Sequence, residues 1–235
     1  MRHAKQSTTL IIFTLVILLF VGCSKNQSVI EGRVIDGSGQ PMPGVKITAR
    51  HFWPVKGYEQ FETVTDSNGV FRFTGLYPVS EYSVVPWSDE WTISEKPMVK
   101  TGLKGTIRKL SSPIIIRFTL LKNGIISDSQ LGVQWLPATE EPMNWFQANK
   151  YVQGLSVDGG GWRLPTRLEL KSIYNVAMKG GADPFFKINE NWVWTSETQG
   201  DSAWFLSFVY GREGTIFREY SGSYGRVLAV RNKRK

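Results

Sequence analysis

The sequence predicts two domains, an all-β sandwich followed by an α+β domain with two helices. Three observations predict this. Up to about residue 121, short runs of alternating apolar and polar residues are separated by Gly, Pro, Asn and Asp, as in a β-sandwich. From residue 123, two segments repeat apolar residues at helical spacing, and strand-like runs follow. A chain of 235 residues with 41% apolar and 20% charged residues fits one large or two small globular domains.

The N-terminus is predicted to be a signal peptide. Arg2 and Lys5 precede an apolar run, Leu10 to Val21, which is shorter than the about 20 residues of a membrane span. The only cysteine, Cys23, follows directly, and residues 20–23 resemble the bacterial lipobox, with Phe where Leu is usual. The resemblance implies cleavage after residue 22, acylation of Cys23 and a tether over residues 23–28. An uncleaved anchor with an incidental cysteine is the alternative.

An acylated, palmitate-bearing Cys23 would make membrane lipid a partner and place the protein in the cell envelope. Ser24 follows, where Asp would resemble an inner-membrane retention signal. We therefore expect the outer membrane if the host has two membranes, and no nucleic acid as a partner. Loss of Arg2 and Lys5 lowers the formal net charge from +8 to +6. Without another cysteine, the mature chain must be stabilised by packing alone.

Basic residues are concentrated between Lys96 and Lys122, where seven Lys and Arg occur without any Asp or Glu. A second group ends the chain, with residues 233–235 as a basic tail. The favoured interpretation is a solvated strand edge and a frayed end. The alternative is contact with anionic headgroups or acidic glycans.

The first domain, residues 29–121, is predicted to be an antiparallel sandwich. Ile30 to Asp36 forms the first strand, and a turn-rich stretch leads to a second strand that begins at Val45. The runs 63–65 and 70–73 flank Asp66-Ser67-Asn68-Gly69, a predicted hairpin turn. Later alternating faces comprise Tyr82, Val84 and Pro86, and then Ile114, Ile116, Phe118 and Leu120.

This half resembles the carboxypeptidase regulatory-like family, whose members are Ig/transthyretin-like sandwiches. The residues that carry the resemblance are Gly32-Arg33-Val34, Asp36, Gly39, Pro41, Gly44-Val45, Thr65-Asp66, Gly69, Phe71, Phe73, Leu76, Pro78 and Tyr82. The resemblance implies a stalk or scaffold without chemistry of its own. Two aromatic loops depart from it, and they contribute the candidate ligand-binding residues Trp53, Trp87 and Trp91. These rings either cap the open end of the sandwich or form a stacking platform for sugars.

The second domain, residues 123–232, begins with two predicted helices. Asn144 and Gln147 can cap the first, and Thr166 and Glu169 form a capping box for the second. The buried stripes are Trp145, Ala148, Val152 and Leu155, then Leu170, Ile173, Tyr174 and Ala177. Gly180-Gly181 is predicted to end the second helix. Strands are expected over Trp192–Thr195, Trp204–Tyr210, Thr215–Arg218 and Val227–Arg231.

Most catalytic and cofactor sites lack their residues. Gly159-Gly160-Gly161 follows a helix and has no Lys or Ser/Thr at P-loop spacing, which argues against nucleotide binding. His51 is the only histidine after the signal, so triads and His/Cys zinc sites are excluded from the second half. A hydrolase based on Glu197 or Asp201 and calcium at residues 189–197 remain weaker alternatives. We predict no catalytic residue, metal or cofactor.

The second half resembles the Lcl C-terminal domain family. The matching residues are Leu131 to Trp135, Trp145 to Ala148, Tyr151, Trp162 to Thr166, Glu169-Leu170, Ser172-Ile173, Trp192 to Ser196, Ala203-Trp204, Phe208, Gly211 and Val230-Arg231. The resemblance implies a C-type lectin-like fold, and the family is named for adhesins that bind sulfated glycans. Val152 and Ala229 replace two cysteines found in many members, which suggests an apolar contact. Formylglycine-generating chemistry, known in the same broad fold, lacks its cysteines here.

We therefore expect an envelope lipoprotein that binds glycans or other surface ligands without catalysis. The first candidate ligand-binding residues are Arg212, Arg218, Tyr220 and Tyr224, ahead of the three tryptophans of the first domain. Trp162, Trp192, Trp194 and Trp204 are expected in the core, and Arg163 is expected to bond carbonyls or a loop carboxylate. A structural subunit that docks another envelope protein is the alternative.

Overall fold

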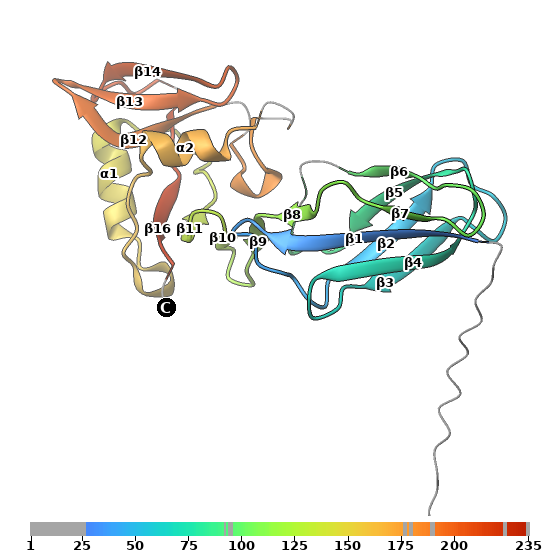
Figure 1. Cartoon of the computed structure of the whole chain (residues 1–235). Coiled ribbons are helices and arrows are strands. Elements are labelled where there is room, and N and C mark those ends of the chain that lie inside the picture. The colour runs from blue at the N-terminus through green and yellow to red at the C-terminus, as the bar shows by residue number, and fades with distance from the viewer. Residues whose placement is uncertain are drawn as a thin grey trace, which may run out of the picture.

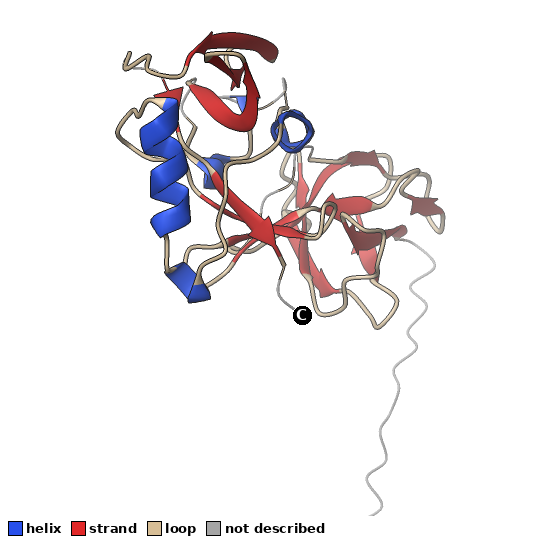
Figure 2. Ribbon diagram, turned by 90° about the vertical axis from the view of Figure 1, so that its left-hand side faces the viewer, coloured by secondary structure: helices blue, strands red, loops and turns tan. Residues whose placement is uncertain are grey.

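A computed structural model describes residues 27–91, 93, 96–175, 178, 181–188, 191–222 and 225–233. Two lobes lie side by side (Figure 1). The first consists of strands, and the helices lie beside the strands of the second (Figure 2). This arrangement confirms an all-β domain followed by a helix-containing α+β domain. The predicted signal peptide, Cys23 and the last two tail residues lie outside the described residues.

The first domain is a sandwich of two four-stranded sheets. The first sheet contains β1 (Ser28–Asp36), β4 (Val70–Leu76), β7 (Ile107–Lys109) and β8 (Ile114–Ile116). The second contains β2 (Lys46–His51), β3 (Gln60–Val64), β5 (Glu81–Pro86) and β6 (Met98–Lys100). Apolar side chains that alternate along these strands fill the core between the sheets. Because β1 pairs in parallel with β7 and β8, the first sheet is mixed and not antiparallel as predicted.

The turn at Asp66 forms as predicted, but its flanking strands do not pair with each other. The Asp66 carboxylate accepts the N–H groups of Asn68 and Val70, and Gly69 takes a φ of 71°. β3 pairs with β2, whereas β4 pairs with β1, so the turn carries the chain from one sheet to the other. The hairpin prediction was therefore wrong. Alternation shows which side chains are buried but not which sheet a strand joins.

The strand expected from Ile114 to Leu120 divides at Arg117. β8 stays with β1, whereas β9 (Phe118–Leu120) pairs with β10 (Ile126–Asp128) in the second domain. Accordingly, Ile116 is buried in the core of the first domain and Phe118 in that of the second. The sheet of the second domain thus begins a few residues before the expected boundary at residue 123.

Two further four-stranded sheets form the second domain. One contains β9, β10, β11 (Val133–Leu136) and β16 (Ala229–Asn232); the other contains β12 (Trp192–Gln199), β13 (Ser202–Ser207), β14 (Arg212–Phe217) and β15 (Gly225–Arg226). The first pairs throughout in antiparallel fashion, whereas β15 runs parallel to β12. Val152 and Ala229 are both buried in one core cluster, in agreement with the expected apolar contact.

Both helices begin where their capping residues predict. α1 (Trp145–Gly154) has a capping box of Asn144 and Gln147, and α2 (Arg167–Ile173) has one of Thr166 and Glu169. α2 ends earlier than predicted, because Tyr174 is extended and its ring packs edge-on against Phe208, 6.0 Å away between centroids. Ala177 and Gly180 of the predicted helix lie outside the described residues.

The glycine run Gly159-Gly160-Gly161 turns the chain after α1. Gly159, Gly160 and Gly161 all have φ between 76° and 82°, a region that L side chains rarely adopt. The carbonyls of Asp158 and Gly160 accept hydrogen bonds from Arg231 at 2.7 and 3.0 Å. The run therefore holds a buried arginine of β16 and serves the architecture of the domain.

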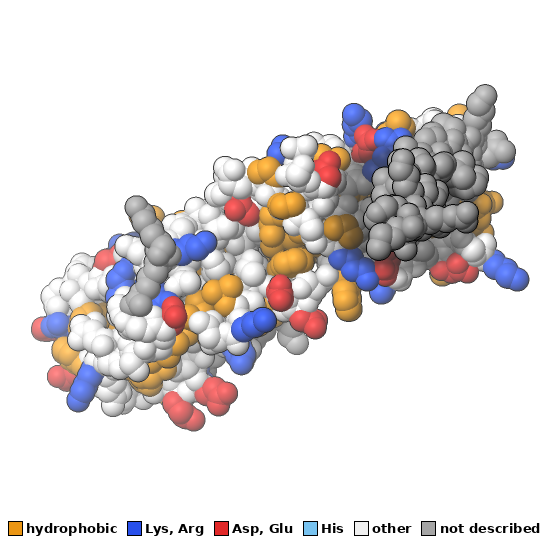
Figure 3. Space-filling model, turned by 90° about the horizontal axis from the view of Figure 1, so that it is seen from below, with side chains coloured by type: hydrophobic (Ala, Val, Ile, Leu, Met, Phe, Trp, Pro, Cys, Tyr) orange, Lys and Arg blue, Asp and Glu red, His pale blue; other side chains and the backbone are white. Residues whose placement is uncertain are grey.

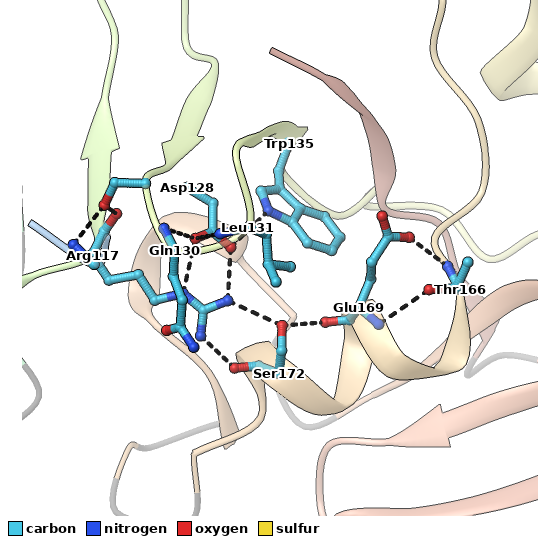
Figure 4. Close-up of polar contacts among 10 residues, drawn as sticks. Arg117, Asp128, Gln130, Leu131, Trp135, Thr166, Glu169 and Ser172 are labelled. Atoms are coloured by element: carbon cyan, nitrogen blue, oxygen red, sulfur yellow. Dashed lines mark hydrogen bonds and ion pairs between the residues drawn. The ribbon is translucent and has the colours of Figure 1, made fainter. Parts of the chain in front are cut away.

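A buried ion pair lies where the chain passes between the domains (Figure 4). Arg117 donates Nε and Nη2 to the two carboxylate oxygens of Asp128 at 2.9 and 2.7 Å, and Asp128 is fully buried. Arg117 also donates to the carbonyl and hydroxyl oxygens of Ser172 near the end of α2. Further donors to Asp128 are the N–H groups of Gln130 and Leu131 and the indole of Trp135.

Ser129 extends this junction to the first domain. Its hydroxyl donates to the Arg117 carbonyl and accepts the N–H of Gly37, both at 2.8 Å. A Cβ on Gly37 would lie 2.9 Å from the Cβ of Gln130, so the contact requires glycine. The end of β1, the crossing residue and the β10–β11 turn are therefore joined directly.

Candidate functional site

The structure brings together only some of the predicted ligand-binding residues of the second domain. Arg212 begins β14, whereas Arg218 follows its end, so about 20 Å of strand separates them. Arg218 and Tyr220 lie close together on the loop after β14, and Tyr224 lies outside the described residues. Arg212 therefore does not share a site with the other two.

Arg218 lies on an aromatic surface at the start of α1. Its guanidinium carbon is 5.1 Å from the ring centroid of Phe146 and 5.9 Å from that of Trp145. The carboxylate of Asp201, 3.6 Å away, pairs weakly with Arg218 because Asp201 is 92% exposed. Phe146 itself is 46% exposed. This surface offers a cation and an open ring face.

Tyr220 continues the aromatic surface. Its ring lies 6.2 Å from that of Trp192, which in turn contacts Phe205 and Trp194 at 4.7 and 4.6 Å between centroids. Trp162 and Trp194 are buried, as expected of core residues. Trp192 is half-buried against the same cluster, so the expectation of a core position holds for it in part.

Trp53, Trp87 and Trp91 do not form one platform. Trp53 lies two residues after His51, the last residue of β2. The N–H of Trp87, in contrast, donates to the carbonyl of Lys46, the first residue of β2. The two rings, 73% and 62% exposed, therefore lie at opposite ends of the sandwich. Trp91 is half-buried against the sandwich core and bridges to Thr119 near the domain junction.

The acidic residues around α2 have structural partners. Glu197 accepts the N–H of Arg167 at the start of α2, at 3.0 and 3.1 Å. The Arg167 guanidinium pairs with Glu213 through two hydrogen bonds and lies 3.6 Å from the ring centroid of the half-buried Trp204. Hydrogen bonds from Arg167, and then from Lys171, lower the pKa of Glu213 to about 2. This network ties α2 to β12 and β14.

Arg163 bonds a carbonyl and a carboxylate, as predicted. It donates to Glu169 at 2.7 and 2.8 Å and to the Leu164 carbonyl at 3.1 Å. The carboxylate comes from α2 and not from a loop as expected. Burial would raise the pKa of Glu169, but the hydrogen bonds from Arg163 and Thr166 outweigh it and lower that pKa.

A groove of about 900 Å³ lies along the open edge of the sandwich, between β6 of one sheet and the β7–β8 segment of the other. Its cationic lining comprises Lys96, Lys100, Arg108 and Lys109. Its apolar lining includes Ile93, Met98, Val99, Leu110 and Ile114. We refer to this feature as the basic groove. It combines clustered positive charge with an apolar wall.

Most of the positive charge in the basic groove has no acidic partner. Lys109 lies 3.7 Å from Glu31, a carboxylate that Arg72 also binds. Within the described part of the chain, Lys96, Lys100 and Arg108 form no ion pair. Elsewhere, on the face shown in Figure 3, Lys and Arg side chains are interspersed with Asp and Glu. Among the residues that the structure describes, the groove is therefore a local concentration of positive charge that is mostly uncompensated.

The acid-free run between Lys96 and Lys122 indicated the clustered positive charge in the sequence, although a solvated strand edge was the favoured interpretation. The sequence could not show that residues 96–100 and 108–115 face each other, because they lie on edges of different sheets.

The residues described hold no group of three or more His, Cys, Asp or Glu that could bind a metal. Of the residues considered for calcium binding, Asn189 and Glu190 lie outside the residues that the structure describes. In the described residues, no helix is long and apolar enough to cross a membrane.

Comparison with protein families identifies both halves of the chain. Residues 29–107 match the carboxypeptidase regulatory-like domain, and residues 124–231 match the Lcl C-terminal domain. A search of curated proteins gave no match. The chain therefore contains both domains that its motifs predicted.

Proposed function

We propose that this chain, a carboxypeptidase regulatory-like domain joined to an Lcl C-terminal domain, is a lipid-anchored envelope protein that binds an acidic glycan without chemical turnover. Acylated Cys23 anchors it to a membrane. The sandwich acts as a spacer and carries one binding surface, and the second domain carries another. The basic groove is the observation that carries the proposal.

The basic groove matches the chemistry of an acidic polysaccharide. Sulfate and carboxylate groups accept charge-assisted hydrogen bonds from Lys and Arg, and these are stronger than neutral ones. The faces of sugar rings are apolar and can pack on the Ile93, Met98 and Leu110 wall. A groove that runs along a sheet edge also suits an extended chain. These features favour an acidic glycan over a neutral one.

The aromatic surface around Arg218 supports binding in the second domain as well. Phe146 presents an exposed ring beside Arg218. Arg218 can bind an acidic group of a ligand and lose only its weak, exposed ion pair with Asp201. The resemblance to the Lcl C-terminal domain implies the same ligand class. Avidity would follow if one polysaccharide contacted both domains.

The roles of Glu197 and Asp201 support binding without catalysis. Glu197 caps α2 through the N–H of Arg167, and Asp201 is almost fully exposed. A glycosidase needs one protonated and one ionised carboxyl group on either side of the scissile bond. Here Glu197 is hydrogen-bonded to the backbone of α2 and Asp201 is solvated, so the two do not form such a pair.

A panel of immobilised polysaccharides tests the proposal. We expect the chain to be retained on sulfated and uronate-containing polysaccharides, to elute as salt rises, and to pass through neutral ones. Measurement of reducing ends in the eluate checks turnover, and we expect none. The alternative, a subunit that docks another envelope protein, predicts no retention on any polysaccharide together with co-purification of one protein partner, and that pair of results would refute glycan binding.

A further inference from the structure

We propose that the end of the sandwich farthest from the second domain is a membrane-contacting surface, through which the first domain sits on the bilayer that holds its lipid anchor. Three loops form this end: residues 52–58, 77–80 and 101–106. We call them the anchor-side tip. The expected distance of this tip from the membrane rests on the proposed acylation of Cys23. The vesicle-binding experiment below uses the chain without its lipid.

Hydrogen bonds hold the three loops together at one end. The N–H of Phe52 bonds the Glu81 carbonyl, and that of Val79 bonds Gly102, both at 2.9 Å. The hydroxyl of Thr101 donates to the carbonyls of Tyr77 and Ser80. β1 begins at this end and runs toward the second domain (Figure 1).

The first described residue, Gln27, is hydrogen-bonded to the anchor-side tip. Its carbonyl accepts the N–H of Gly105 at 3.1 Å, and the neighbouring Ser28 hydroxyl donates to Gly102 and Leu103. Four residue steps separate Gln27 from Cys23, and an extended chain spans at most about 3.6 Å per step. Acylated Cys23 would therefore hold the tip within about 14 Å of the headgroups.

The anchor-side tip exposes large apolar side chains from each loop. The exposed fractions are 54% for Phe52, 73% for Trp53, 56% for Val79 and 71% for Leu103. Trp is a side chain that membrane interfaces favour, because one edge is polar and the ring is apolar. Lys56 and Lys104, both exposed, lie in the same loops and can meet anionic headgroups.

The backbone at Val79 strengthens the inference. Val79 has a φ of 50°, a left-handed conformation that is unfavourable for a β-branched residue and that Gly or Asn adopts easily. Because Val79 is 56% exposed, its side chain gains little from packing within the fold. This position does place an apolar side chain at the tip, which suits contact with lipid.

Vesicle binding of the unlipidated chain, residues 24–235, tests the surface. We expect it to sediment with vesicles of phosphatidylethanolamine and phosphatidylglycerol. Trp53→Ser and Leu103→Ser should each weaken partitioning about tenfold, the factor that roughly 1.4 kcal/mol of lost apolar transfer represents. Trp87→Ser is the matched control, an exposed tryptophan at the opposite end, and should change partitioning less than twofold.

Val79→Asn separates membrane contact from folding. Asn tolerates the left-handed backbone, so thermal stability should be kept or raised while vesicle binding falls at least threefold. No sedimentation of the wild-type chain, or equal losses for the Trp53 and Trp87 variants, would overturn the proposal. Palmitate labelling of the full chain and of Cys23→Ser tests the anchor separately, so that either idea can fail alone.

Discussion

At the scale of residues, charged side chains mainly join parts of the fold that are distant in sequence. Arg117 and Asp128 connect the domain junction with α2 through Ser172 (Figure 4). Arg163 donates two hydrogen bonds to the carboxylate of Glu169, which also forms the capping box of α2 with Thr166. The sequence predicted that Arg163 would bond a carbonyl or a carboxylate, but it did not predict Glu169 as the partner, although Glu169 lies only six residues further along the chain. The Arg117 contact with Ser172 could not be predicted, because it bridges residues 55 positions apart.

Asp128→Asn should destabilise the protein strongly. The change leaves the Arg117 guanidinium, 16% exposed, without its buried counter-charge, and breaking such a pair costs about 3–5 kcal/mol. Equilibrium urea unfolding measures the loss. Asp201→Asn is the control, because Asp201 is 92% exposed and its pairing with Arg218 is worth at most about 1 kcal/mol. Equal effects of the two changes would mean that the buried pair has no special role.

At the scale of elements, local signals predicted where helices begin but not how strands pair. Both capping boxes lie within four residues of sequence and formed as expected. The Asp66 turn formed as well, yet β3 and β4 joined different sheets. The end of α2 also depends on distant residues, since Tyr174 leaves the helix to pack on Phe208. Strand pairing and the ends of helices depend on tertiary contacts, which the alternation of apolar residues and their local propensities do not predict.

The ionic link between α2 and β14 should make stability depend on pH. The pKa of Glu213 is about 2 in the fold because of its bonds to Arg167 and Lys171, below its ordinary value of 4.5. A depressed folded pKa stabilises fully above the unfolded pKa, and that stability is lost as pH falls from about 5 to 2. Thermal melts of wild type and Glu213→Gln over this range should show a steeper decline for wild type. Parallel curves would contradict the assignment.

At the scale of the whole molecule, the first domain lies between the anchor-side tip and the second domain. β1 runs the length of the sandwich, nine residues or roughly 26 Å, from the anchor-side tip to the domain junction. The second domain is therefore held away from the proposed membrane surface. Domain order and both families could be predicted from motifs such as Trp-Arg-Leu-Pro, since these lie close together in sequence. The basic groove could not, because two sheet edges have to meet to form it.

Above all, we propose that the basic groove binds an acidic glycan. The most direct test is the dissociation constant of a sulfated oligosaccharide, measured by calorimetry for wild type, Lys100→Gln/Arg108→Gln and a control, Lys150→Gln/Lys233→Gln. Both double variants lose two positive charges at exposed positions, but only the first changes the groove. We predict that the groove variant binds about tenfold more weakly, that the control stays within twofold, and that wild-type affinity falls as salt rises. Equal affinities of the two double variants, or an affinity indifferent to salt, would contradict the claim.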